Sequence, residues 1–409
     1  MIFKTYTTKI GDTYESISKK LYGLPSSANT IEKINGVVGD LKNGLKLKVP
    51  IDNVNDLSGS TLPRVVIEDA EFVIFEELTI VKSLIGVTIA YISVLFDPND
   101  KDHVKYFKFG NNASVYIDNK LKLTGEIKII SPIADKNKRL WTIGIKSHAG
   151  LLLDTHIPKT FFPLEYLNVT ISEIITRICN GFGVGLVFDD SVEEVLNIVI
   201  DNNYGVSASA GITETPFDYI LRLVSTRGIN VSDDSEGNLF IYKFKKADSV
   251  LSIIEGLTTG FTSLGALYDY DSLHRNYHIF SQYGDSDNYA VSRFDIFSLP
   301  LHKNIISPDS SSGNTEEYSK WILCRHIGNS IKVMFSLPSF NFEGVSLSVG
   351  DIVNIKAQSL GIYEETEMVI EEIKETQTLS EMTKIVLTVP GAYTGEVPER
   401  LPLLKEEDV

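Results

Sequence analysis

Cysteine is scarce in this sequence, whose 409 residues include only Cys179 and Cys324. Two distant cysteines provide neither a disulfide framework nor the closely spaced pairs that bind zinc. Cys179 follows Ile174, Ile175 and Ile178 at helical spacing, so we expect a buried free thiol that packs like a small apolar side chain. This use of cysteine fits synthesis in a reducing compartment.

Positive charge is also in short supply. The chain has 38 Lys and Arg against 54 Asp and Glu, which gives a net charge of −16. A nucleic-acid-binding protein normally carries a basic patch, so this balance disfavours specific binding of DNA or RNA. The acidity either keeps the protein soluble or forms a surface past which DNA moves without adhering.

Long apolar runs are missing. The longest, Leu84 to Phe96, is broken by Gly86, Thr88 and Ser93 and is too short to span a bilayer. The N-terminal residues lack a basic region followed by an apolar run, so we expect no secretory signal.

Catalytic motifs are not found either. The sequence contains no G-x-S-x-G, H-E-x-x-H or P-loop pattern. His274 and His278 are four residues apart but lack a visible third metal ligand. The glycines from Gly181 to Gly185 follow a helical pattern. In this position they fit the C-terminal cap of that helix better than a phosphate-binding loop. We therefore predict no enzymatic activity, no metal and no cofactor.

The first segment has a clear pattern of its own. Thr5 to Pro50 reads as strand, helix, helix, strand, with Thr13 as the N-cap of the first helix. Its motifs resemble the LysM domain in order and spacing: Gly11-Asp12-Thr13, Tyr22-Gly23, Ile31-x-x-Ile34-Asn35 and Gly44-x-x-Leu47-x-Val49-Pro50.

The LysM resemblance implies a shallow groove for N-acetylglucosamine polymers. The matching positions in this sequence are Gly11, Asp12, Thr13, Asn35 and Gly36. The same residues also have structural explanations, since glycines supply turns, Thr13 supplies a cap and Asn35 can end a helix. The module therefore either touches peptidoglycan or docks onto neighbouring proteins.

The remainder alternates between strand-rich and helical parts. After a polar linker at 51–63, residues 64–157 read as a small antiparallel barrel, including a strand at Lys105 to Phe109 and a hairpin turn at Asp118-Asn119. Residues 158–250 combine two helices with a hairpin. The first helix has a Thr170–Glu173 capping box, and the second opens at Thr215-Pro216. Residues 251–394 return to strands in a second barrel region, and 395–409 form an acidic tail.

This order of elements resembles the phage late-control or baseplate-hub proteins of Mu-type tails, which are similar in fold to the base of the type VI secretion spike. The resemblance spans roughly residues 64–393. It rests on the elements around Thr215 to Leu223, Arg227-Gly228-Ile229, Asp233-x-x-x-Gly237-Asn238-Leu239, Leu347 to Val353, Val369 to Ile373 and Leu387 to Tyr393. The implied fold class is α+β, mainly β: a small βααβ LysM domain, then two small antiparallel β-barrels with an intervening helix-containing α+β region.

The resemblance also implies a function. Such a hub is a homotrimer whose paired barrels form a ring of pseudo-sixfold symmetry and join the tail tube to the central spike. Baseplate wedge proteins are further expected partners, and peptidoglycan is a candidate partner of the LysM module. DNA is expected to pass through the ring without specific binding. The expected location is the virion tail baseplate, assembled in the host cytoplasm. The alternatives are a LysM-targeted peptidoglycan-binding protein or murein hydrolase, and a tailocin component in place of a phage one.

Overall fold

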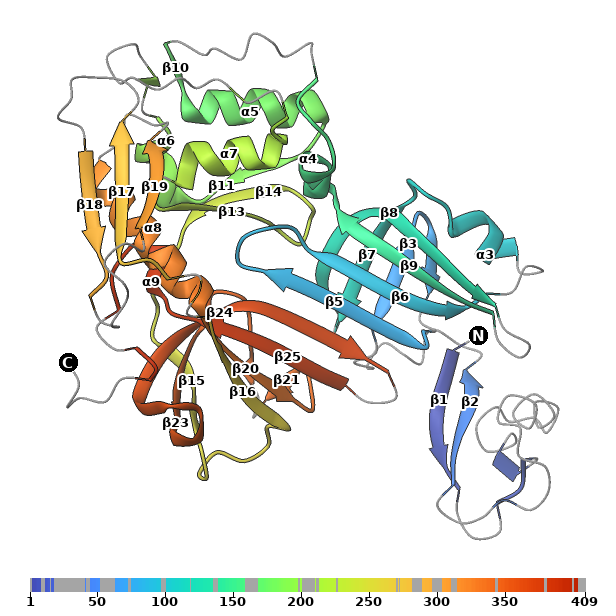
Figure 1. The fold of residues 1–409 in the computed structure, drawn as a ribbon. Coiled ribbons are helices and arrows are strands. Elements are labelled where there is room, and N and C mark those ends of the chain that lie inside the picture. The colour runs from blue at the N-terminus through green and yellow to red at the C-terminus, as the bar shows by residue number, and fades with distance from the viewer. Residues whose placement is uncertain are drawn as a thin grey trace.

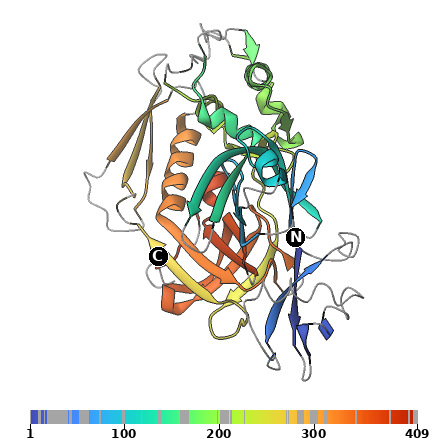
Figure 2. The ribbon, with the colours of Figure 1, turned by 90° about the vertical axis from the view of Figure 1, so that its right-hand side faces the viewer.

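The structure is a computed structural model in which strands predominate over helices, which confirms the expected α+β, mainly β class. Figures 1 and 2 show its layout from two directions. It describes residues 2–8, 12–14, 16–17, 41, 45–51, 63–72, 75–96, 101–117, 119–134, 139–158, 168–197, 199–200, 210, 213–225, 227–269, 271, 273–281, 289–295, 304–309, 315–342, 345–378, 381–398 and 401–403.

A pair of strands brackets the N-terminal segment. β1 (Ile2–Thr7) runs antiparallel to β2 (Lys46–Ile51), with Tyr6 opposite Leu47. Both strands were expected at these places. Residues 18–40, which hold the rest of the expected helices, lie outside the described residues.

The first β-unit is a curled antiparallel sheet in the order β5-β6-β9-β8-β7-β3-β4. Apolar and polar residues alternate along its strands, so one face encloses a core that includes Ile92, Val115, Ile127 and Ile143. Asn119, with φ of 60°, forms part of the expected two-residue turn between β7 and β8. The strands are β3 (Arg64–Ile67), β4 (Ala70–Phe72), β5 (Glu77–Ser83), β6 (Ile89–Leu95), β7 (Asn112–Ile117), β8 (Lys120–Ala134) and β9 (Arg139–Ser147).

One predicted strand of this unit is a helix. Residues 105–109 alternate in polarity, yet Lys101–Tyr106 form α3 and the chain then turns at residues 107–110. The reason is aromatic packing, because Tyr106 and Phe107 both turn into the core against Phe72. In a strand, two consecutive side chains would point to opposite faces.

The middle region packs helices on a small sheet in the order β11-β14-β13. Helix α5 (Ile171–Phe182) has the expected capping box between Thr170 and Glu173, and α7 (Pro216–Ser225) is capped by Thr215, which accepts a hydrogen bond from the Asp218 amide at 3.1 Å. The other elements are α4 (Leu151–Asp154), β10 (Val169–Thr170), β11 (Leu186–Phe188), α6 (Glu193–Leu196), β12 (Val199–Ile200), β13 (Ile229–Asp233) and β14 (Leu239–Lys243).

The second β-unit has the order β16-β20-β25-β24-β23-β15. Its strands are β15 (Ser249–Ile254), β16 (Ser263–Tyr268), β20 (Ile331–Leu337), β23 (Ile352–Ala357), β24 (Ile362–Gln377) and β25 (Glu381–Thr388). A separate sheet, β18-β17-β19, packs on helix α8 (Thr315–Ser330) through Tyr277 and Ile279. The remaining elements are β17 (Asn276–Ser281), β18 (Tyr289–Arg293), β19 (Asn304–Asp309), β21 (Asn341–Phe342), β22 (Val345–Ser346) and α9 (Gly391–Thr394).

The two β-units are joined into one sheet. β5 of the first unit pairs antiparallel with the far half of β24 in the second, from Ser83 opposite Glu372 to Leu78 opposite Gln377. Figure 1 shows β5 (blue) beside β24 (red), although the two strands are far apart in the sequence. Each unit has its own hydrophobic core, and Phe340, which follows β20 of the second unit, packs into the core of the first.

Candidate functional site: the junction between the two β-units

The predicted glycan groove is only partly described. Asp12 is half-buried and Thr13 is exposed, while Gly11, Asn35 and Gly36 lie outside the described residues. Thr13 has the expected capping role: its hydroxyl accepts a hydrogen bond from the Ser16 amide at 3.1 Å, and its own amide donates to Ser16 Oγ at 2.8 Å. The glycan or docking role of these five residues stays a prediction.

The best-defined polar site lies where the two β-units meet. On β5 and β24, the hydroxyls of Thr79 and Thr376 are 3.1 Å apart and buried. Beside them, Lys122 of β8 forms a 2.8 Å ion pair with Glu375 of β24, whose side chain is 9% exposed. This hydrogen-bonded ion pair adds a geometrically specific contact between the two units.

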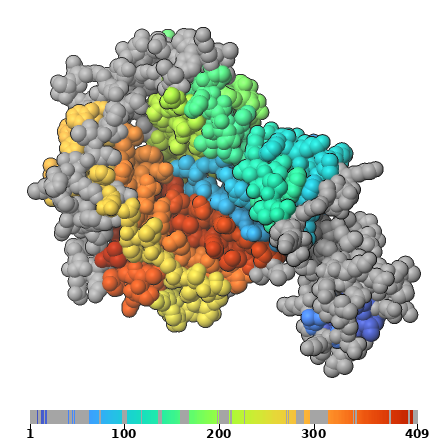
Figure 3. Space-filling view, turned by 45° about the vertical axis from the view of Figure 1, so that its right-hand side comes forward, coloured from blue at the N-terminus to red at the C-terminus, as the bar shows by residue number. Residues whose placement is uncertain are grey.

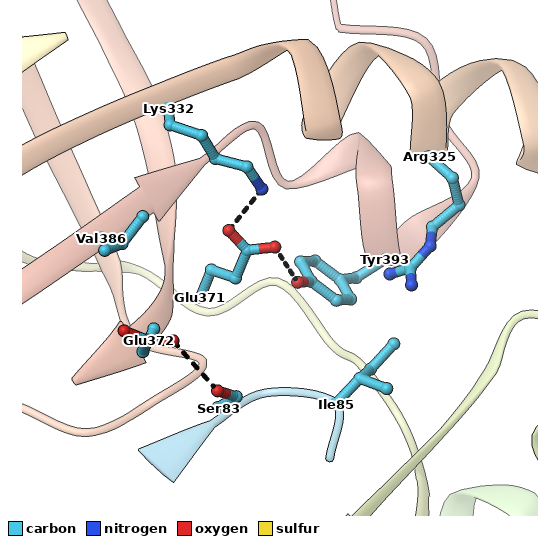
Figure 4. Close-up of a pocket in the computed structure, with 8 residues that line it drawn as sticks. All are labelled: Ser83, Ile85, Arg325, Lys332, Glu371, Glu372, Val386 and Tyr393. Atoms are coloured by element: carbon cyan, nitrogen blue, oxygen red, sulfur yellow. Dashed lines mark hydrogen bonds and ion pairs between the residues drawn. The ribbon is translucent and has the colours of Figure 1, made fainter. Parts of the chain in front are cut away.

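A second polar cluster centres on Glu371. Its carboxylate pairs with Lys332 of β20 and accepts a 3.1 Å hydrogen bond from the Tyr393 hydroxyl of α9. The neighbouring Glu372 accepts a 3.4 Å hydrogen bond from Ser83 at the end of β5. These contacts tie the second unit to both α9 and the first unit, as Figure 4 shows.

These residues line a cavity of about 410 Å³. Arg325 of α8 and Ile85, just beyond β5, complete its wall together with Val386 of β25. The Arg325 guanidinium lies 5.2 Å from the ring centres of Trp321 and Tyr393, and within the described part of the chain it forms no ion pair. In Figure 3, light-blue atoms of the first unit lie beside orange and red atoms of the second.

Two tyrosines of this region have hydroxyl pKa values that are raised by burial. Burial raises the pKa of the Tyr393 hydroxyl, and the adjacent Glu371 carboxylate raises it further. Burial also raises the pKa of Tyr242, whose hydroxyl donates a 2.7 Å hydrogen bond to the Leu84 carbonyl. Both phenols therefore remain protonated donors at neutral pH, and they hold elements together rather than acting as bases.

The acidic run at Glu364, Glu365 and Glu367 faces solvent and nearby polar groups. Glu367 pairs with Lys246, Glu364 lies 3.9 Å from Lys356, and Glu365 accepts a hydrogen bond from Ser252. Glu371 and Glu372 differ, because they belong to the junction. A sequence run alone does not separate these two roles.

The remaining sequence candidates stay apart from this junction. Both cysteines are free and buried, and burial raises each thiol pKa to about 12. The ring of His274 packs against Tyr277 and His326, while His278 contacts Tyr289. Within the described ranges, no three metal-binding side chains gather in one place. None of the helices that the structure describes is long and apolar enough to cross a membrane.

Arg325, Lys332 and Tyr393 were not identified from the sequence as site residues. They stand on α8, β20 and α9, and only the packing of the second unit brings them together. Ordinary Arg, Lys and Tyr residues at such separations carry no local spacing signal.

Comparison with known proteins identifies solved structures that share the fold of this chain. No family model matches the chain, and no curated protein matches it. Among solved structures, the 43 kDa tail protein of prophage MuSo2 from Shewanella oneidensis has a TM-score of 0.67 at 17% identity, over 81% of this chain and 99% of that one. A tail protein from Neisseria meningitidis MC58 has a TM-score of 0.67 at 14% identity, over 82% and 98%. Prophage tail protein gp18 from Listeria monocytogenes EGD-e has a TM-score of 0.53 at 12% identity, over 80% and 94%. This chain therefore has the fold of these phage tail proteins.

Proposed function

We propose that the chain is a structural baseplate hub of a phage-like tail and acts as a homotrimer. In this role, three copies form a ring that joins the tail tube to the central spike, contacts baseplate wedge proteins and leaves a channel for DNA. The observation that carries the proposal is the edge-to-edge fusion of two β-units into one sheet through β5 and β24. A rigid pair of alike units is what a threefold assembly needs to present a six-membered ring.

The similarity to three phage tail proteins over nearly their whole lengths supports this proposal. The charge supports it as well, because a net charge of −16 disfavours adhesion of DNA to the channel wall. The expected location is the virion tail, after assembly in the host cytoplasm.

A non-enzymatic role agrees with the junction chemistry. Glu371 is occupied by Lys332 and Tyr393, and both thiols are protonated and buried. The hub function needs none of these groups to react. Zymography on peptidoglycan should show no clearing by the full chain, and a clearing zone would favour the murein hydrolase instead.

The N-terminal segment is proposed to be a LysM module that docks the hub onto neighbouring baseplate proteins. The cap formed by Thr13 and Ser16 is the described feature that supports this fold. Co-sedimentation of the full chain with insoluble peptidoglycan distinguishes docking from wall contact. Retention that disappears on Asp12→Ala would assign the groove to glycan, and no retention would favour docking.

The test of the hub is the molar mass of the full chain. Light scattering after size exclusion, over a hundredfold range of concentration, should give three times the 45.5 kDa of one chain at the upper end. A mass of one chain at every concentration would contradict the trimer.

A further inference from the structure

The two β-units repeat one another. Reading across each sheet, β5-β6-β9-β8-β7 of the first unit has the same order and the same antiparallel pairing as β16-β20-β25-β24-β23 of the second. The fourth strand is the long one in both units, with 15 residues in β8 and 16 in β24.

Each unit has a register shift in its long fourth strand, and aligning the two shifts matches the residues of one unit with those of the other. The pairing of β8 with β9 shifts between Ile127 and Ile129, and that of β24 with β25 shifts between Ile370 and Glu372. Ile129 therefore corresponds to Glu372. Crossing the first sheet from Ile129 leads through Gly144 and Tyr91 to Thr79.

The same crossing in the second sheet starts at Glu372. It leads through Val386 and Met334 to Gly265 of β16. Gly265 is therefore the counterpart of Thr79, and β16 is the counterpart of β5.

The junction within the chain then predicts a second junction. The far half of β24 pairs with β5, and the counterparts of these two strands are the far half of β8, residues 129–134, and β16. Within the part of the chain that the structure describes, β8 beyond residue 129 pairs only with β9, and β16 pairs only with β20. Residues 129–134 of β8 and strand β16 therefore each have a free edge, and these are the edges that correspond to the paired edges of β24 and β5.

Both edges present apolar side chains to solvent. Ile129 is 45% exposed and Ile133 is 59% exposed on β8, and Leu267 of β16 and Met334 of β20 are 56% and 41% exposed. The residue between Ile129 and Ile133 on the same face is Ser131, so this outward face of β8 has no charge. An uncharged edge strand tends to pair with another strand unless charge or proline protects it. Pro132 provides no N–H donor in this segment, so at its position the partner strand can bond only to its carbonyl oxygen.

The shapes of the two edges agree with pairing. Thr376 lies opposite Thr79 in the internal junction, and the corresponding pair is Ile133 opposite Gly265. A Cβ added at Gly265 would meet nothing within 4 Å, so the chain itself does not require a glycine there. The missing side chain leaves room for the large, exposed Ile133 of another copy.

We infer that residues 129–134 of one copy pair antiparallel with β16 of a second copy, with Ile133 opposite Gly265 and Ser131 opposite Leu267. This inference rests on the proposed hub function. Each copy offers one edge of each kind, so the contact is head-to-tail and closes into a ring when the rotation per copy permits. The β-units then alternate around the ring, and every seam repeats the β24–β5 junction.

Engineered disulfides test the register. Residues directly opposite in an antiparallel pair have Cα atoms about 4.5–5.5 Å apart, which suits a disulfide. The double variant Ile133→Cys with Gly265→Cys should cross-link between copies under mild oxidation and give a ladder ending at three chains on a denaturing gel. The native thiols are both buried and do not compete.

A one-residue shift is the matched control. Ile133→Cys with Ala266→Cys places the two thiols on opposite faces of the sheet, so it should give less than a tenth of the cross-linking. Equal cross-linking by both variants, or none by the first, would overturn the inference.

Gly265→Glu gives an independent test, since the open space around Gly265 allows the chain to fold. Its light-scattering mass should fall to one chain with an unchanged far-ultraviolet spectrum, whereas Val187→Glu, at an exposed site on β11, should keep the wild-type mass. A Gly265→Glu protein that keeps the wild-type mass would contradict the seam.

The seam and the hub can fail separately. A trimer that does not cross-link through Ile133→Cys and Gly265→Cys would reject the seam and keep the hub. Register-specific cross-links that end at two chains or continue into open polymers would support the seam and reject the trimeric hub.

Discussion

Asp233 accepts two hydrogen bonds from Thr88. The Thr88 amide donates to one carboxylate oxygen at 3.0 Å and the Thr88 hydroxyl donates to the other at 2.8 Å. Thr88 lies just before β6 of the first β-unit and Asp233 ends β13 of the middle region, and the two residues are 1% and 2% exposed. The contact therefore connects two regions through a carboxylate with no ion pair among the described residues.

Burial raises the pKa of Asp233, although the hydrogen bonds from Thr88 oppose the shift. A carboxyl whose folded pKa exceeds the unfolded value of about 3.9 contributes stability below that value and loses it as pH rises through the folded pKa. Asp233→Asn removes this titration, so the fall in melting temperature between pH 4 and pH 7 should be smaller than in wild type. Differential scanning fluorimetry at both pH values measures the difference.

Asp189 supplies a control of opposite sign. Hydrogen bonds from Ser191 lower the pKa of its carboxyl, so its contribution is present above about pH 4 and is lost as pH falls. Asp189→Asn should therefore lower the melting temperature more at pH 7 than at pH 4. A pH response of Asp233→Asn equal to that of wild type would contradict the assignment of Asp233.

The Lys122–Glu375 pair predicts a junction that depends on both partners. Lys122→Met leaves the nearly buried Glu375 carboxylate without its cation, and we expect a loss of about 2 kcal/mol in the free energy of unfolding. Adding Glu375→Gln removes the stranded charge and should recover about half of that loss. Urea unfolding of Lys122→Met, Glu375→Gln and the double variant measures this coupling, and additive losses would show that the residues act separately.

Much of the fold was predictable wherever a local signal coincided with the tertiary packing. The capping box at Thr170, the N-cap at Thr13 and the turn at Asn119 are local, and the structure has them where the sequence placed them. Helix α8 was missed. Its buried side includes Ser319, whose hydroxyl donates to the Glu316 carbonyl and lies 2.7 Å from Ser292, so a buried polar residue interrupts the apolar stripe.

The junction could not be found from the sequence for a different reason. Thr79 of β5 and Thr376 of β24 are 297 positions apart in the sequence, and both are ordinary strand residues until they face each other. Strand pairing of this range depends on the packing of both units and leaves no short motif. The relation between the two β-units likewise lies in strand order and in the position of a register shift.

The two native cysteines should be inert in the folded protein. Both thiols are buried, and the rise of each pKa to about 12 keeps them protonated at pH 8. Ellman's reagent should detect fewer than 0.2 thiols per chain natively and about two after denaturation in guanidinium, because reaction requires exposed thiolate. Rapid native labelling would contradict the packing of α5 or α8.

Gly237 should be essential to the contact between the middle region and the first β-unit. It has a φ of +87°, and a Cβ there would approach the Thr124 carbonyl oxygen to 2.5 Å. Gly237→Ala therefore combines left-handed strain with a backbone clash, and we expect a loss of about 3 kcal/mol. Gly256→Ala is the matched control, because its φ is +80° and its Cβ meets nothing within 4 Å. It should cost only about 1 kcal/mol from strain, so the difference between the two urea midpoints isolates the clash. Equal losses would mean that the hairpin tip can move away from Thr124 without cost.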